Sequence, residues 1–196
     1  DVEYVVVKSH SQSTPSELKA PTEPNTAPQD IAEKLEDGNL ATRIAKVLDL
    51  AKHAENQLKH VCQRIESVGE KDFEVLEHIA NDINKILADD PVATMLLIKL
   101  HDTQPSIYDH SINVAMLTGL FSHEMGFEAA ICHELVIAGL LHDIGLTTVP
   151  KRIMENKGYL SETETRILQG HVDLGKEVLQ AQYKNISDIC LSAILH

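Results

Sequence analysis

Aromatic side chains are scarce in this 196-residue chain: they make up 4% of the residues, and there is no Trp. A core must then be built mainly from Leu, Ile, Val and Ala, a composition that favours helices packed on helices. Hydrophobic residues still make up 43% of the chain, which is ordinary for a globular protein and excludes a wholly disordered one. We therefore expect a folded, helical protein with one sizeable core.

Basic residues are also few, with 17 Lys and Arg against 30 Asp and Glu, for a net charge of -13. Such a surface repels nucleic-acid backbones and anionic membranes, so DNA and RNA are not expected partners. A small anionic substrate is not excluded, because a bound metal ion can dominate the local field. No apolar run has the length that predicts a membrane span, and the N-terminus has no secretory signal pattern.

Cysteine is rare as well, and its three copies, Cys62, Cys132 and Cys190, are far apart in the sequence. This pattern predicts no disulfide framework and favours a reducing cytoplasm. Cys62 and Cys132 lie within apolar periodic runs, so we expect both in the core.

The first thirty residues differ in composition from the rest. Residues 1–7 are rich in Val and predict a strand, which we interpret as the end of a small N-terminal domain. Residues 8–30 are rich in Ser, Thr, Gln and Pro, which is typical of a disordered linker. Because the chain starts without Met and stops within an apolar pattern, we interpret it as a fragment of a longer polypeptide.

Residues 31–90 predict a helical hairpin. Apolar residues recur three and four apart along residues 40–68, and residues 73–87 form a second amphipathic segment. The narrow apolar seam of residues 44–68 has two interpretations. It packs within the hairpin or on the next domain, or it forms the stem of a homodimer.

Residues 91–196 predict further helices, at 92–100, from Ser106, at 128–142, after Ser161, after His171 and at 186–196. Ser106 and Ser161 each precede an acidic residue three positions later, as in capping boxes. The helix at 128–142 is apolar nearly all round and so belongs at the centre of the fold. With no strand signal after residue 7, the predicted fold class is all-α.

His142 and Asp143 end this central helix, and we expect Gly145 to close it through backbone angles open to glycine. Buried ionisable groups must be paired or bound to metal. His110 and His171 lie on neighbouring predicted helices, and His and Asp ligands without cysteine suit Fe, Mn or Zn. The alternative is a capped helix end with an incidental histidine, since the chain has eleven.

Several motifs in this order resemble the HD-GYP family, a subgroup of the HD metal-dependent phosphohydrolases. The resemblance covers residues 105–196 and includes His110-Ser111, Gly139-Leu140-Leu141-His142-Asp143-Ile144-Gly145, Val149-Pro150, Lys157-x-x-Leu160-Ser161 and His171-x-x-x-Gly175. It implies an HD-domain helical bundle that hydrolyses the bacterial messenger cyclic di-GMP to pGpG or GMP in the cytoplasm.

The resemblance also implies a site with two divalent metal ions, Fe or Mn, with Zn as an alternative. His110, His142 and Asp143 would bind the first metal, and Asp143 would bridge to a second metal held by His171. His196 aligns with the first His of a His-His-Glu element. His142 and Asp143 would carry catalysis, in which a hydroxide shared by the two metals attacks phosphorus in line.

Two positions depart from the family pattern. Leu146 stands where the motif usually has a Lys that contacts the scissile phosphate, and Ser106 stands where three-metal members place a Glu. The Gly-Tyr-Pro loop and the remaining ligands are expected after residue 196. The alternatives are a catalytically degenerate cyclic di-GMP signalling or scaffold module acting through its helices, and an HD hydrolase of another phosphoester.

Overall fold

Every regular element in the described part of the chain is a helix. The computed structural model describes residues 40–64, 70–100, 106–182 and 186–195. Within these ranges there is no strand, and the predicted all-α fold class is confirmed. The predicted strand at residues 1–7, the linker at 8–30 and His196 lie outside the described residues.

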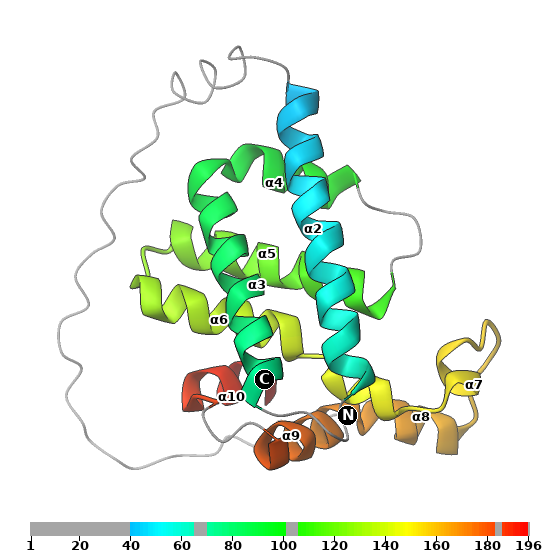
Figure 1. Ribbon diagram of the computed structural model, residues 1–196. Coiled ribbons are helices and arrows are strands. Elements are labelled where there is room, and N and C mark those ends of the chain that lie inside the picture. Colours follow the sequence, from blue (N-terminus) through cyan, green and yellow to red (C-terminus); the bar gives the residue numbers. More distant parts are fainter. Residues whose placement is uncertain (1–39, 65–69, 101–105, 183–185, 196) are drawn as a thin grey trace, which may run out of the picture.

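The helices form a bundle, and the helix of residues 40–63 runs from top to bottom across its front in the view of Figure 1. In chain order they are α2 (Leu40–Gln63), α3 (Glu70–Asp89), α4 (Pro91–Leu100), α5 (Ile107–Glu124), α6 (Ala129–Leu141), the 3-10 helix η2 (Ile144–Thr148), α7 (Lys151–Met154), α8 (Glu162–Gln169), α9 (His171–Gln182) and α10 (Asp188–Leu195). The longer helices start and end within a few residues of the predicted segments, apart from the C-terminal end of α2. Periodicity did not predict η2 and α7, because four or five residues carry too little of a repeating pattern.

The apolar seam of α2 is buried inside the chain. Val47, Ala51, Ala54, Leu58 and Val61 are each at most 8% exposed, and α2 contacts α3, α4 and α5. The same core cluster continues through α5 and α6, so the hairpin shares one core with the helices that follow. Packing on the next helices accounts for the described part of the seam. These side chains are therefore not available for the alternative interpretation, a homodimer through residues 44–68.

A half-buried ion pair joins the hairpin to the next helix. Arg43 donates from Nε and Nη2 to the two carboxylate oxygens of Asp90, at 2.6 and 2.7 Å. Asp90 also accepts a hydrogen bond from the Ala93 backbone N–H at 3.0 Å, which caps α4. This side chain thus ties the start of α2 to the start of α4.

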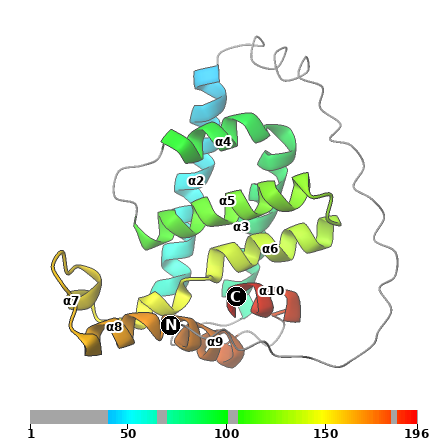
Figure 2. The ribbon, with the colours of Figure 1, turned by 180° about the vertical axis from the view of Figure 1, so that it is seen from behind.

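Helices α5 and α6 form the most extensively packed pair, and they lie side by side in both views (Figures 1 and 2). Their close approach depends on small residues. A Cβ atom on Gly139 would lie 2.7 Å from the Ala115 Cα, and one on Gly119 would lie 2.8 Å from a methyl carbon of Val136. Because the two helices run in opposite directions, this contact brings the first turn of α5 next to the end of α6.

Residues Ala129–Thr148 are long and apolar enough, by length and composition, to cross a membrane. From the sequence we expected no apolar run of that length. Half of the window is buried inside the protein, and α6 packs against α5, α3 and α10. A core helix passes the same test, so the length and composition of this segment are weak evidence for a membrane span.

The three cysteines are free and buried, as predicted for Cys62 and Cys132. Burial raises the pKa of the Cys62 and Cys190 thiols to about 12. Both thiols are therefore protonated near neutral pH, a state that is a poor nucleophile and metal ligand.

Candidate metal centre

The backbone turns sharply where α6 ends. His142 keeps helical angles (φ -55°, ψ -35°), whereas Asp143 leaves them (φ -104°, ψ 15°) and η2 begins at the next residue. The Leu146 N–H donates to the Asp143 carbonyl at 2.9 Å, which starts the new helix. This change of direction brings two adjacent side chains, which diverge on a regular helix, together at one point.

Gly145 has a different role from the predicted one. Among the described residues only Gly126 has a positive φ, so the prediction that Gly145 ends the helix through glycine-specific angles was wrong. A Cβ atom on Gly145 would lie 1.9 Å from the His171 carbonyl oxygen and 2.7 Å from the Gly175 backbone nitrogen. Glycine is needed here because η2 and α9 meet backbone to backbone.

This backbone contact places His171 beside Asp143. The two oxygens of the Asp143 carboxylate face different histidines. Oδ2 lies 3.1 Å from the His142 Nε2 and 3.7 Å from the His110 Nε2. Oδ1 lies 3.2 Å from the His171 Nε2. One carboxylate is therefore surrounded by imidazoles from the start of α5, the end of α6 and the start of α9.

Backbone carbonyls fix the orientation of two of these rings. The Nδ1 of His142 lies 2.8 Å from the Gly139 carbonyl oxygen, and the Nδ1 of His171 lies 2.6 Å from the Leu168 carbonyl oxygen. An Nδ1–H that donates to a carbonyl leaves Nε2 as the nitrogen that can bind a metal ion. In both histidines that nitrogen is the one that faces Asp143.

The ionisation of this pair reflects burial and contact together. Burial would lower the pKa of His142, but the hydrogen bonds to Asp143 and to the Gly139 carbonyl hold this pKa above its ordinary value. Burial would raise the pKa of Asp143, but the hydrogen bond to His142 and the charges of the three histidines hold it below its ordinary value. Asp143 is thus an anion, ready to accept cations or proton donors.

The donor set fits divalent cations. Ligand atoms of His110, His142 and Asp143 all lie within 4.8 Å of one another, and they form a candidate metal site. His171 lies outside this group of three, on the other oxygen of Asp143. His110 is the most accessible ligand, with its side chain 51% exposed, whereas the other two imidazoles are about a quarter exposed. The cluster is therefore open on the α5 side.

Ser106 and Leu146, the two departures from the family pattern, lie close to the cluster. Ser106 caps α5 by accepting from the Asp109 N–H at 3.0 Å, and its hydroxyl donates to the Glu55 carboxylate at 2.6 Å. Leu146 is half-buried in η2, three residues after Asp143. Neither position carries the charged side chain of the family pattern.

Two other histidines, His123 and His133, join a polar network away from the candidate site, as expected for residues that match no ligand position. The His133 Nε2 lies 2.7 Å from a carboxylate oxygen of Glu77, and the His123 Nε2 lies 3.2 Å from the Asn84 Oδ1. This network links α3 to α5 and α6. Sequence reasoning had no signal for these pairings, because each joins residues more than thirty positions apart.

Comparisons with known proteins agree on one domain family and on relatives of one reaction class. The family model described as "HD domain" matches residues 94–196. A cyclic di-GMP phosphodiesterase of Pseudomonas aeruginosa is 26% identical over 118 residues, which are 60% of this chain and 28% of that protein. A second cyclic di-GMP phosphodiesterase, of Borreliella burgdorferi, is 35% identical over 88 residues, which are 44% of this chain and 23% of the relative.

A 3'3'-cGAMP-specific phosphodiesterase of Vibrio cholerae is 31% identical over 87 residues, 44% of this chain and 20% of the relative. The chain thus spans between a fifth and three tenths of the length of these relatives. No solved structure matches. The family model covers more than half of the chain, and its matched residues include His110, His142, Asp143 and His171. The chain belongs to the HD domain family.

Proposed function

We propose that this chain is the metal-binding part of a phosphodiesterase that hydrolyses cyclic di-GMP. One observation carries the proposal: the two oxygens of Asp143 face separate sets of histidines, His110 and His142 on one side and His171 on the other. This arrangement supports a two-metal site in which Asp143 is the bridging ligand. The names of the relatives support the reaction class.

The chain's own residues prepare this site for two cations. His142 and His171 present Nε2 in a fixed orientation because carbonyl groups hold their Nδ1 atoms. Asp143 supplies the negative charge for both positions. When bound, divalent cations supply Lewis acidity to phosphoryl oxygens and lower the pKa of a water molecule. Fe or Mn are the metals we propose, with Zn as the alternative for the same ligands.

Metal content and turnover test this function together. We expect the metal-loaded protein to contain about two metal ions per chain and to hydrolyse cyclic di-GMP. Asp143→Ala should lose both properties, whereas His142→Ala should lose turnover and retain fewer metal ions than the wild type. His78→Ala, an exposed histidine on α3 outside the cluster, is the matched control and should retain both properties. A wild-type protein that binds no metal would contradict the site.

Leu146 favours a second candidate, a degenerate signalling module that keeps the metal site without turnover. A neutral leucine replaces a cation that would contact the phosphate, so less positive charge is available there. The assay separates the two functions when 3'3'-cGAMP and a simple phosphodiester are included beside cyclic di-GMP. Bound metal without hydrolysis of any of the three would favour the signalling module, and hydrolysis of only the other substrates would favour a different phosphoesterase.

A further inference from the structure

A groove of about 690 Å³ lies between the last turns of α2, the first turn of α5, and the segment from η2 to α7. Its volume is in the range of small-molecule sites, roughly 300–1,000 Å³. The lining residues come from four elements: Lys59, Cys62, Gln63, Arg64, Ile107, Tyr108, Leu146, Thr147, Val149, Lys151 and Met154. The groove is thus built by segments that are far apart in the sequence.

The charges on this groove are opposite in sign to the protein's net charge. Its described lining contains Lys59, Arg64 and Lys151 and no carboxylate, in a chain with a net charge of -13. Asp72 lies 3.6 Å from the Arg64 guanidinium and offsets part of its charge. Lys59 on α2 and Lys151 on α7 are exposed and line the groove. A concave surface lined by cations favours an anion.

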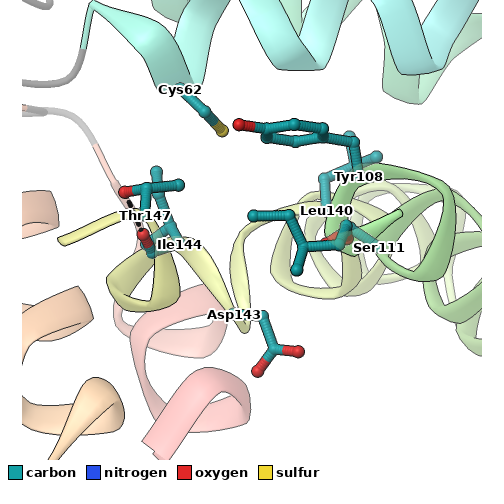
Figure 3. Close-up of a pocket in the computed structure, with 8 residues that line it drawn as sticks. Cys62, Tyr108, Ser111, Leu140, Asp143, Ile144 and Thr147 are labelled. Carbon is teal, nitrogen blue, oxygen red and sulfur yellow. Dashed lines mark hydrogen bonds between the residues drawn. The ribbon is translucent and has the colours of Figure 1, made fainter. Parts of the chain in front are cut away.

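The groove runs beside the candidate metal centre and does not contain it. Ile107 is one helical turn before His110, and Leu146 is three residues after Asp143. A small pocket lined by Asp143 shares Cys62, Ile107, Tyr108 and Thr147 with the groove. Figure 3 shows the Asp143 carboxylate pointing away from Cys62 and Tyr108. A substrate whose reacting phosphate lies at Asp143 can therefore reach the groove only with another part of its structure.

We propose that this groove binds the second, non-reacting phosphate of a cyclic dinucleotide, with Lys59 and Lys151 as its positioning residues. The inference rests on the proposed function, since it takes the reacting phosphate to lie at the metal centre. The apolar surface of Leu146, Val149 and Met154 and the ring of Tyr108 provide contact for the attached nucleoside.

A comparison of two substrates distinguishes a positioning role of Lys59 and Lys151 from a general effect of their replacement on the fold. Cyclic di-GMP has two phosphates, whereas bis(4-nitrophenyl) phosphate has a single phosphodiester and nothing that reaches the groove. In the metal-loaded protein, Lys59→Gln/Lys151→Gln should raise the KM for cyclic di-GMP roughly tenfold and leave its kcat unchanged. Both constants for bis(4-nitrophenyl) phosphate should stay at wild-type values. Lys46→Gln/Lys85→Gln, on exposed positions of α2 and α3, is the matched control.

The possible outcomes distinguish failure of the groove proposal from failure of the proposed function. Wild-type turnover with an unchanged KM in the groove variant would overturn the groove proposal alone, as would an equal loss on both substrates. Absence of wild-type turnover would overturn the proposed function. Calorimetric titration of the metal-loaded protein with cyclic di-GMP then tests the groove without relying on turnover. Binding that Lys59→Gln/Lys151→Gln weakens roughly tenfold supports it, and no binding or equal binding overturns it.

Discussion

Replacing Gly145 by alanine tests whether the contact between η2 and α9 builds the metal centre. The added Cβ atom would lie 1.9 Å from the His171 carbonyl oxygen, 2.7 Å from the Gly175 nitrogen and 2.9 Å from the His171 carbonyl carbon. All three are backbone atoms, so no side-chain rotation can relieve the overlap. The segments must move apart, and His171 moves away from the Oδ1 of Asp143, now 3.2 Å from its Nε2.

The expected loss of stability follows from this overlap. Adding one carbon atom to a tightly packed site costs about 1–3 kcal/mol of unfolding free energy, and contacts with backbone place this case at the upper end. In a domain of this size, each kcal/mol lowers the Tm by roughly 2–4 °C. Metal content should fall as well, from about two ions per chain toward one, because the ligand that moves belongs to the second proposed position.

Urea unfolding of the metal-free protein measures the first effect, and elemental analysis of the metal-loaded protein measures the second. Gly158→Ala is the matched control, because its Cβ would meet only the Asn156 side-chain oxygen, at 3.3 Å. It should leave both quantities unchanged. A Gly145→Ala protein with wild-type stability and wild-type metal content would refute the reasoning, because the backbone contact would then not position His171.

Two further predictions concern the seam of α2 and the ionisation of the site. Leu58→Ala, at a position that is 1% exposed, should lower the unfolding free energy by about 2–5 kcal/mol without changing the molar mass in light scattering; a change of mass would indicate a dimer seam instead. In the metal-free protein, His142 and Asp143 should stabilise the fold most between pH 3.8 and 6.5, their ordinary pKa values. Their contribution is lost as the pH rises through the raised pKa of His142 or falls through the lowered pKa of Asp143. The destabilisation by His142→Gln should therefore be larger near pH 5 than near pH 8 in urea unfolding with chelator, and an equal effect at both would count against this ion pair.

Metal binding at the proposed two-metal site should depend on Asp143 more than on any single histidine. Each histidine contacts one carboxylate oxygen, whereas Asp143 serves both sides. Loss of one imidazole would therefore weaken one metal position, and loss of the carboxylate would weaken both. His110 is the most exposed of the proposed ligands, so in the proposed function the α5 side is where a phosphate group would approach the centre.

Local features of the fold were within reach of the sequence. The long helices were predicted because an apolar residue every three or four positions leaves one continuous face. Ser161 was predicted to cap α8, and the structure has the full capping box with Glu164. The position of His142 and Asp143 at the end of the most apolar helix was predicted as well, since each of these signals lies within a few consecutive residues.

The tertiary structure alone decided which of these residues meet. Sequence periodicity could not say whether the seam of α2 faces its own chain or a second copy, because both arrangements bury the same side chains. It also could not identify the role of Gly145, which depends on α9 lying against η2. The orientation of each Asp143 oxygen, and a groove lined by both Lys59 and Lys151, depend on contacts between residues that are far apart in the chain. Local pattern specifies which groups are present, and packing determines which of them act together.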